Sequence, residues 1–255
     1  MTFRNRPRRI PRAVGGTLLA LATLAACGGP AEDAAPEERG FGPVGPRLTI
    51  AVGSGELDVR PADVDEVTVR RWFTAWSITG TKAEPAWEFE DDRLTLTAEC
   101  GPAVLSGCDA RYEVRVPRST RLTVDGGSGA VTAAGFDTPL RIDSDNGAVR
   151  VDDAASPLSL RTTSGGLRAT GIRSDRVDAR SENGRIHLSF AAVPDDVEAA
   201  AENGGVTVEV PEAAYDVTTA TDNGEVRNGL GKDSGSRHRI TARTDNGAIR
   251  LRTTS

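Results

Sequence analysis

The polar groups best placed for binding chemistry in this 255-residue chain are five Asn-Gly pairs, each preceded by an acidic residue. They are Asp145-Asn146-Gly147, Glu182-Asn183-Gly184, Glu202-Asn203-Gly204, Asp222-Asn223-Gly224 and Asp245-Asn246-Gly247. Carboxylate and amide oxygens can coordinate Ca²⁺ and can accept hydrogen bonds from glycan hydroxyls. The Ca²⁺-binding nonapeptide repeat requires Gly-Gly-x-Gly-x-Asp at a nine-residue period, which this sequence lacks. We therefore expect these pairs to be structural, with no metal and no cofactor.

The spacing of the pairs indicates a repeat. Glycines that align with Gly147 are 18, 18, 19, 20, 20 and 23 residues apart, at Gly129, Gly147, Gly165, Gly184, Gly204, Gly224 and Gly247. Short runs that alternate between apolar and polar residues flank them, such as Leu140 and Ile142 before one corner and Val149 and Val151 after it. Such alternation predicts strands with one buried face.

Two topologies fit a repeat of strand, turn and strand. One is a meander of hairpins, for which Asn-Gly is the strongest local signal because it suits a type I′ turn. The other is a parallel solenoid, in which each repeat is one coil and equivalent corners stack. The near-constant period favours the solenoid, with asparagines that tolerate a left-handed conformation and stack as a ladder. We expect an all-β fold, a single-stranded parallel β-solenoid (β-helix) of 18–20-residue coils over residues 118–255.

Residues 48–59 already form one such unit of strand, Ser-Gly turn and strand, but residues 60–117 break this rhythm and contain all three tryptophans, Trp72, Trp76 and Trp87. We assign residues 47–117 to one region. The tryptophans could form a ligand platform, but a hydrophobic cap that closes one end of the stack is the interpretation we favour, because solenoids need distinct terminal units. We therefore expect an irregular β cap at the N-terminal end. At the other end, residues 251–255 leave the last coil as an open edge, which either arginines protect or a partner chain pairs with.

Two of the three cysteines lie close together in the sequence, and the third, Cys27, lies near the N-terminus. Cys100 and Cys108 form an even pair across a short flexible segment, which predicts a disulfide in an oxidising compartment. A metal site with two cysteines would need nearby histidines, and the only two, His187 and His238, lie far along the chain.

The first 26 residues form a targeting segment. Five arginines precede an apolar run over residues 13–26, which ends in Leu24-Ala25-Ala26-Cys27. This ending resembles the lipobox of bacterial lipoproteins, which implies cleavage before Cys27 and acylation of that cysteine. We expect an extracytoplasmic protein held on the membrane by its lipid, with residues 27–46 as a disordered tether. An ordinary secretory signal is the alternative.

Charge limits the choice of partners. The chain has a net charge of −6, and removing residues 1–26 removes five arginines and no acids, which gives −6 − 5 = −11. An acidic protein of this kind is a poor ligand for nucleic acid. We expect no nucleic acid partner.

An enzyme that acts on polysaccharides, a β-helix lyase or glycoside hydrolase, is the alternative function. Asp143, Asp145, Asp152 and Asp153, with Arg150, could form the carboxylate cluster that glycoside cleavage requires. The repeats are nearly uniform, however, and contain no long inserted loop to form a cleft. Aromatic residues that could stack on sugars are almost absent after residue 117. We therefore expect no catalytic residues.

The stretch from Tyr112 to Val131, with its Val-Pro strand end and its Ser-Gly-x-Val turn followed by x-Asn-Gly-x-Val repeats, resembles the DUF4097 family of bacterial surface proteins. Members are called adhesins from their appearance. The resemblance covers about residues 47–255 and implies a β-solenoid displayed outside the cell, with no catalytic residues. We expect an adhesin-like or scaffold protein whose partner is an envelope protein or a glycan.

Overall fold

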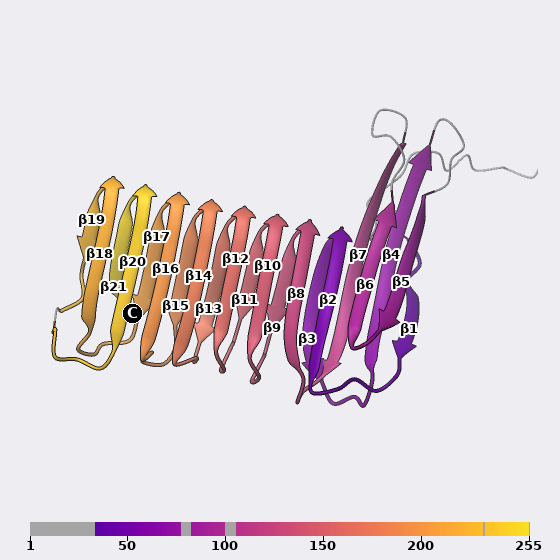
Figure 1. Cartoon of the computed structure of the whole chain (residues 1–255), viewed down its shortest axis with the longest axis horizontal. Coiled ribbons are helices and arrows are strands. Elements are labelled where there is room, and N and C mark those ends of the chain that lie inside the picture. The colour runs from indigo at the N-terminus through magenta and orange to yellow at the C-terminus, as the bar shows by residue number, and fades with distance from the viewer. Residues whose placement is uncertain (1–33, 78–82, 100–105, 232, 255) are drawn as a thin grey trace, which may run out of the picture.

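The computed structural model describes residues 34–77, 83–99, 106–231 and 233–254. Every element in these ranges is a β-strand, and the strands form two large sheets that lie face to face along an elongated stack (Figure 1). Within the same ranges, no helix is long and apolar enough to cross a membrane. The fold is therefore all-β, as the sequence predicts.

Each repeat contributes one strand to each sheet. The ten-stranded sheet contains, in spatial order, β18 (Asp216–Asn223), β20 (Arg239–Asn246), β16 (Asp196–Asn203), β14 (Arg176–Asn183), β12 (Leu158–Ser164), β10 (Leu140–Asn146), β8 (Arg121–Ser128), β2 (Arg47–Ser54), β6 (Arg93–Glu99) and β5 (Glu84–Glu90). The eleven-stranded sheet contains β1 (Glu37–Phe41), β4 (Val67–Ser77), β7 (Ser106–Pro117), β3 (Glu56–Ala62), β9 (Val131–Ala134), β11 (Val149–Asp152), β13 (Leu167–Ile172), β15 (Ile186–Phe190), β17 (Val206–Val210), β21 (Ile249–Thr253) and β19 (Val226–Asn228).

Equivalent positions of neighbouring repeats lie side by side. Strand β10 pairs in parallel with β12, so that Leu140 lies opposite Leu158 and Asn146 lies opposite Ser164. The two strands that flank each Asn-Gly corner belong to different sheets and do not pair with each other. The hairpin meander is therefore wrong, and the architecture is a solenoid-like stack of parallel strands.

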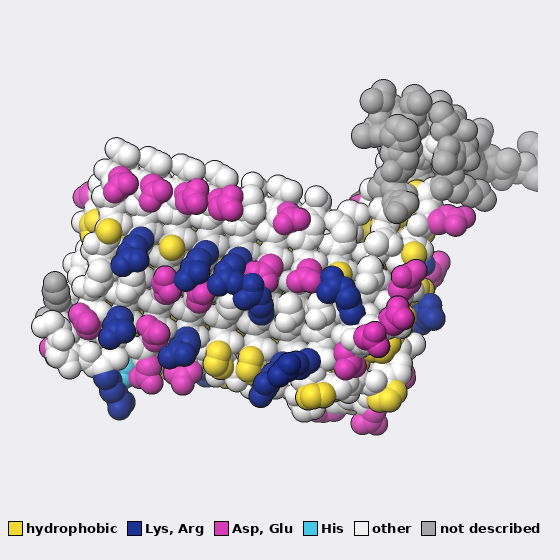
Figure 2. Space-filling view, in the orientation of Figure 1, with side chains coloured by type: hydrophobic (Ala, Val, Ile, Leu, Met, Phe, Trp, Pro, Cys, Tyr) yellow, Lys and Arg dark blue, Asp and Glu magenta, His cyan; other side chains and the backbone are white. Residues whose placement is uncertain are grey.

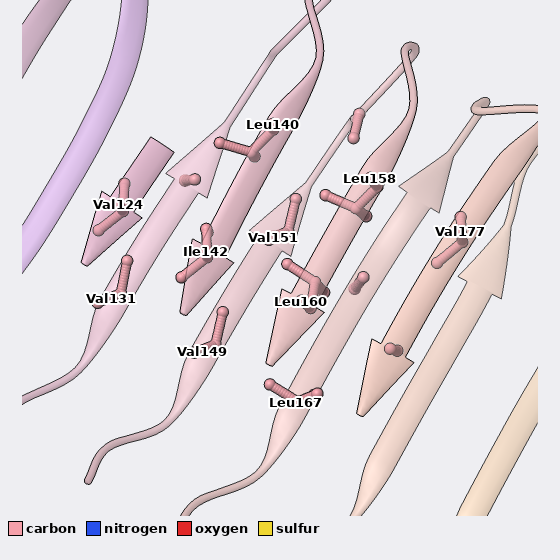
Figure 3. Packing of buried hydrophobic residues seen from close by; sticks show 14 of the residues in the cluster. Val124, Val131, Leu140, Ile142, Val149, Val151, Leu158, Leu160, Leu167 and Val177 are labelled. Carbon is pink, nitrogen blue, oxygen red and sulfur yellow. The ribbon is translucent and has the colours of Figure 1, made fainter. Parts of the chain in front are cut away.

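The core is a thin layer between the two sheets. Leu140 and Ile142 of β10 point inward and meet Val149 and Val151 of β11, and all four are at most 2% exposed. Figure 3 shows these side chains stacked against the equivalent residues of the neighbouring coils. Because the buried residues form one cluster along the whole stack, each coil is stabilised mainly by the coils on either side of it.

The coils do not follow sequence order at the C-terminal end. Strands β20 and β21 lie between β16–β17 and β18–β19, so β18 and β19 form the end of the stack (Figure 1). The expectation that residues 251–255 leave an open edge is therefore wrong. Composition gives the physical reason, since β20 and β21 bury Ile240 and Leu251 completely or nearly so. The end coil instead has Thr219 at the position of Ala242, and its Val226 is 40% exposed.

The same departure from sequence order occurs at the N-terminal end. Strands β2 and β3 pair directly with β8 and β9, and β6 and β7 lie outside them. Both sheets therefore continue through residues 47–117, and the predicted boundary between cap and solenoid at residue 117 is not a structural one. Among the described residues, the strands of this end that depart from the parallel pattern are β1, β4 and β5, which pair antiparallel and close the end.

Strand β1 corrects the predicted tether. Residues 37–41 lie in the segment expected to be disordered, yet they pair with β4. Phe41 is 5% exposed and packs edge-on against Trp87, with 6.1 Å between ring centroids, while Glu37 forms an ion pair with Arg71. An aromatic anchor and an ion pair explain why this polar segment is ordered.

Candidate functional site

The corner glycines are required by close approach of the backbone. A Cβ atom on Gly147 would lie 1.9 Å from the carbonyl oxygen of Gly129, and one on Gly184 would lie 1.8 Å from that of Gly165. No asparagine among the described residues has a positive φ angle, so the expected left-handed conformation is wrong. The glycines thus let successive coils meet at the corner, and the asparagines beside them keep ordinary backbone geometry.

Four of the five predicted corner asparagines form a ladder. The amide of Asn203 donates to Asn183 Oδ1 at 3.2 Å, Asn246 donates to Asn203 at 3.0 Å, and Asn223 donates to Asn246 at 3.0 Å. Asn146 lies outside the ladder because Ser164 occupies the position between it and Asn183. The structural role predicted for the asparagines therefore has direct support at four positions.

The acidic residues of the corners form an exposed row. Glu182, Glu202, Asp245 and Asp222 occupy equivalent positions on neighbouring strands, and Figure 2 shows acidic side chains in a line along this margin. Equivalent side chains in the row are about 4.8 Å apart and point outward in parallel. In the ranges that the structure describes, no three His, Cys, Asp or Glu side chains are arranged to hold a metal ion.

Along β10, β12 and β14, the outer face of the ten-stranded sheet pairs its cations with carboxylates, and Figure 2 shows the two charges side by side on this face. The pairs include Arg141 with Asp143 at 2.6 Å, Arg161 with Asp178 at 3.1 Å and Arg180 with Glu198 at 3.0 Å. Mutual neutralisation leaves these strands little net attraction for a charged ligand. Toward the ends of the same sheet, Arg47, Arg121, Arg239 and Arg243 form no ion pair among the described residues.

The residues proposed for glycoside cleavage are divided between the two faces. Asp143 and Asp145 lie on β10 and line one pocket, whereas Arg150 and Asp152 lie on β11, in the other sheet, with the core between. Asp153 follows β11 with a φ of 57° and lies on neither strand. The predicted cluster of four carboxylates with Arg150 therefore does not form, and Asp143 pairs with Arg141 instead.

The outer face of the eleven-stranded sheet has a groove of about 890 Å³. Small residues line it next to the corners, namely Ala130, Ala148, Gly166, Gly205 and Ala248. Exposed arginines rise beside them, namely Arg150, Arg168, Arg185 and Arg250. This group was not predicted from the sequence, although Arg150, Arg168 and Arg250 each stand three residues after an aligned glycine, which is a regularity that the repeat makes visible.

His187 occupies the same repeat position as these arginines and lies half-buried in the groove. Burial lowers the pKa of His187, and the charges of Arg168 and Arg252 lower it further, while Glu209 acts in the opposite direction. The imidazole is therefore mostly neutral at pH 7. A neutral ring between cations can donate and accept hydrogen bonds with hydroxyl groups.

The tryptophans lie at the N-terminal end of the stack. The guanidinium of Arg71 lies 3.9 Å from the ring centroid of Trp87, and that of Arg70 lies 4.9 Å from the ring of Trp72. Trp76 is 44% exposed. Because the protein's own cations cover the rings of Trp72 and Trp87, the cap interpretation fits these two better than a ligand platform does.

The predicted cysteine chemistry falls largely outside the described residues. Cys27, the predicted lipidation site, and Cys100, one half of the predicted disulfide, both lie outside them. Cys108 lies on β7, opposite Ala75 of β4. Lipidation and the disulfide therefore stay predictions.

The parallel stack of coils with repeated corners defines a β-strand repeat protein of the solenoid type. The family model described as Toastrack DUF4097 matches residues 46–255, and the chain belongs to this family. Comparison with curated protein sequences gives no match.

Several solved structures are similar to this chain. A proposed adhesin from Bacteroides fragilis NCTC 9343 is 12% identical with a TM-score of 0.47, over 86% of this chain and 97% of that one. A proposed lipid binding protein from Parabacteroides distasonis ATCC 8503 is 13% identical with a TM-score of 0.43, over 86% and 97%. A proposed cell adhesion protein from Clostridium sporogenes ATCC 15579 is 12% identical with a TM-score of 0.32, over 86% and 100%. These proteins carry adhesion or lipid-binding names.

Proposed function

We propose that this chain is an extracytoplasmic lipoprotein, anchored to the cell membrane through Cys27, whose solenoid domain acts as an adhesin-like or scaffold protein of the cell envelope. It performs no catalysis, and its partner is an envelope protein or a glycan. The carrying observation is the stack itself, because it places equivalent residues of successive coils in exposed rows on two long faces. Such extended surfaces are what repeat proteins use for binding.

The enzyme alternative has less support. Its candidate carboxylates, Asp143 with Asp145 and Asp152, belong to opposite sheets. Glycoside hydrolases need two carboxyl groups within about 10 Å that flank one bond. The adhesin-like role requires no such pair.

The lipid anchor would hold the solenoid near the membrane. Residues 28–36 separate Cys27 from the start of β1 at Glu37. Nine residues span at most ~30 Å when fully extended. The N-terminal end of the stack would therefore lie close to the membrane, with both faces available to the envelope.

A Cys27→Ser variant tests the anchor. We expect the wild-type protein to incorporate a labelled fatty acid and to sediment with membranes, and the variant to do neither, since serine provides no thiol for the lipid. Cys108→Ser serves as the control and should keep both properties. A Cys27→Ser protein that remains labelled and membrane-bound would overturn the anchor.

Crosslinking on intact cells followed by mass spectrometry tests the interaction. We expect the full-length lipoprotein to capture a defined envelope protein or glycan. If repeated experiments crosslink only abundant molecules that happen to lie nearby, the adhesin-like role is contradicted.

A further inference from the structure

The arginines of the groove have no acidic partners. Among the described residues, Arg150, Arg168, Arg185 and Arg250 form no ion pair and no side-chain hydrogen bond, and all four are exposed. On the opposite sheet, the cations of the same three coils, Arg141, Arg161 and Arg180, each pair with a carboxylate. Over the coils from β10 to β15 the two faces therefore differ in charge balance, although the same coils build both.

Two carboxylates on this face are engaged by other cations. Glu209 forms an ion pair with Arg252, and Glu225 pairs with Arg227 at 2.8 Å. Asp152 accepts a hydrogen bond from Thr170 and keeps its negative charge, but it does not line the groove. The lining contains four arginines and no carboxylate, so the groove keeps a surplus of positive charge.

Two of these arginines are direct cross-strand neighbours. Arg150 of β11 lies opposite Arg168 of β13 in the parallel register. Like charges placed directly opposite each other destabilise a sheet. The pair is therefore unfavourable by itself, and an anion bound above the two side chains would relieve the repulsion.

The groove suits a single extended chain. It runs from Ala130 to Ala248 across six neighbouring strands, β9 to β21, which at ~4.8 Å per strand is about 24 Å. Its small lining residues leave the backbone accessible. Between the cations at its two ends lie His187 and Thr207, which are uncharged hydrogen-bonding groups.

We propose that this groove binds a linear anionic glycan of the polyuronate class, with uronate carboxylates on the arginines and ring hydroxyls on His187 and Thr207. The inference rests on the proposed function and names the partner class. The planar guanidinium binds a carboxylate through two parallel hydrogen bonds. A uronate chain supplies one carboxylate and several hydroxyls on each ring, which matches the mixture of cations and neutral polar groups.

Other linear polyanions fit less well. Side chains on one face of an extended acidic peptide recur about every 6.6 Å, which falls out of step with strands ~4.8 Å apart. Nucleic acid binding depends on many phosphate contacts from a basic protein, whereas this chain is acidic. The favoured ligand is therefore a glycan.

Calorimetric titration with hexagalacturonate tests the proposal. We expect the full chain to bind it, to bind more weakly as salt increases, and to show no binding of the neutral maltohexaose. The double variant Arg150→Gln/Arg168→Gln should weaken binding by at least about tenfold, because charge-assisted hydrogen bonds are lost. The melting temperature of this double variant should equal or exceed that of the wild-type protein.

The matched control is Arg141→Gln/Arg161→Gln, which makes the same change in net charge on the opposite face. It should change the affinity by less than about twofold, since these exposed charges lie far from the groove. Absence of hexagalacturonate binding, or an equal loss in both double variants, would overturn the groove assignment. Hexaglutamate binding as tight as hexagalacturonate would overturn the glycan class.

Failure of this titration is distinguishable from failure of the proposed function. If the protein captures an envelope partner on intact cells but does not bind hexagalacturonate, the adhesin-like role is supported and the groove assignment is rejected. A wild-type protein that incorporates no labelled fatty acid would rule out the anchor without affecting the titration.

Discussion

At the scale of single residues, the distance between coils is set by glycine. A side chain at a corner glycine would occupy the carbonyl oxygen of the next coil, as the 1.8 Å separation at Gly184 shows. Backbone hydrogen bonds hold the corners at this distance, for example from the Gly184 amide to the Asn203 carbonyl oxygen at 3.0 Å. The corner glycine is therefore the position of each repeat that tolerates substitution least.

Gly184→Ala should destabilise the protein strongly. The new methyl group collides with backbone that cannot move without shifting a whole coil, so we expect the free energy of unfolding to fall by at least about 3 kcal/mol. Gly166→Ala is the matched control, because its Cβ atom would meet nothing closer than 3.6 Å. We expect a change of at most about 0.5 kcal/mol for it. Urea unfolding measures both, and similar losses for the two variants would contradict the account.

Asn203→Ala should remove the centre of the amide ladder. Its side chain donates to Asn183 and accepts from Asn246, so both hydrogen bonds disappear. Because the ladder is exposed, we expect a loss of about 1 kcal/mol in unfolding free energy. Asn146→Ala, outside the ladder, should cost less. Equal effects at the two positions would show that the ladder adds nothing to stability.

His187 should make stability depend on pH. Its folded pKa lies below the ordinary value, chiefly because of burial. The unfolded chain therefore binds a proton more readily, and stability is full above the ordinary histidine pKa and declines as pH falls from about 7.5 to 5.5. In His187→Gln, the drop in melting temperature over this range should be smaller. An unchanged drop would indicate that His187 does not titrate as described.

At the scale of strands and coils, the period of the repeat predicts the all-β stack but not its order. Apolar alternation of residues such as Val149 and Val151 marks inward positions on every strand, since a strand with one buried face must alternate. The order of the last coils depends on which coil buries more apolar surface, a comparison between segments that a local pattern does not contain. Residues 37–41 were not predicted as a strand for a similar reason, because their order depends on contacts of Phe41 and Glu37 with residues far along the chain, such as Trp87.

The site could be predicted only in part. The ladder of asparagines follows from corners that must stack, and four of the five are placed as expected. The groove was not predicted because the Asn-Gly signal marks the residues before each glycine, whereas Arg150 and Arg168 follow the glycines by three positions. Their lack of acidic partners depends on cross-strand neighbours, which only the register determines.

Hydrogen exchange tests the order of the coils. The end coil, residues 216–228, has neighbours on one side only, whereas β20–β21 lies between two coils. We expect amides of residues 239–253 to exchange more slowly than those of residues 216–228, because end strands open first. A stack in sequence order would give the reverse ranking, with the last residues exchanging fastest.

At the scale of the whole molecule, the repeat produces two faces of different character. The face of the ten-stranded sheet pairs its arginines with carboxylates along β10, β12 and β14, whereas the face of the eleven-stranded sheet keeps unpaired arginines along a groove. A rod tethered near the membrane at one end would present the second face to extended polymers of the envelope. Its binding should be sensitive to salt, because exposed charges are screened.

The most direct measurement of this central claim compares crosslinking from the two faces on intact cells. A photo-crosslinking amino acid is placed in the full-length protein at Thr207, in the groove, or at Thr241, on the opposite face, both half-buried positions. We predict that the Thr207 probe captures an anionic glycan and that the Thr241 probe does not. Capture of the same partner from both positions, or from Thr241 alone, would contradict the account.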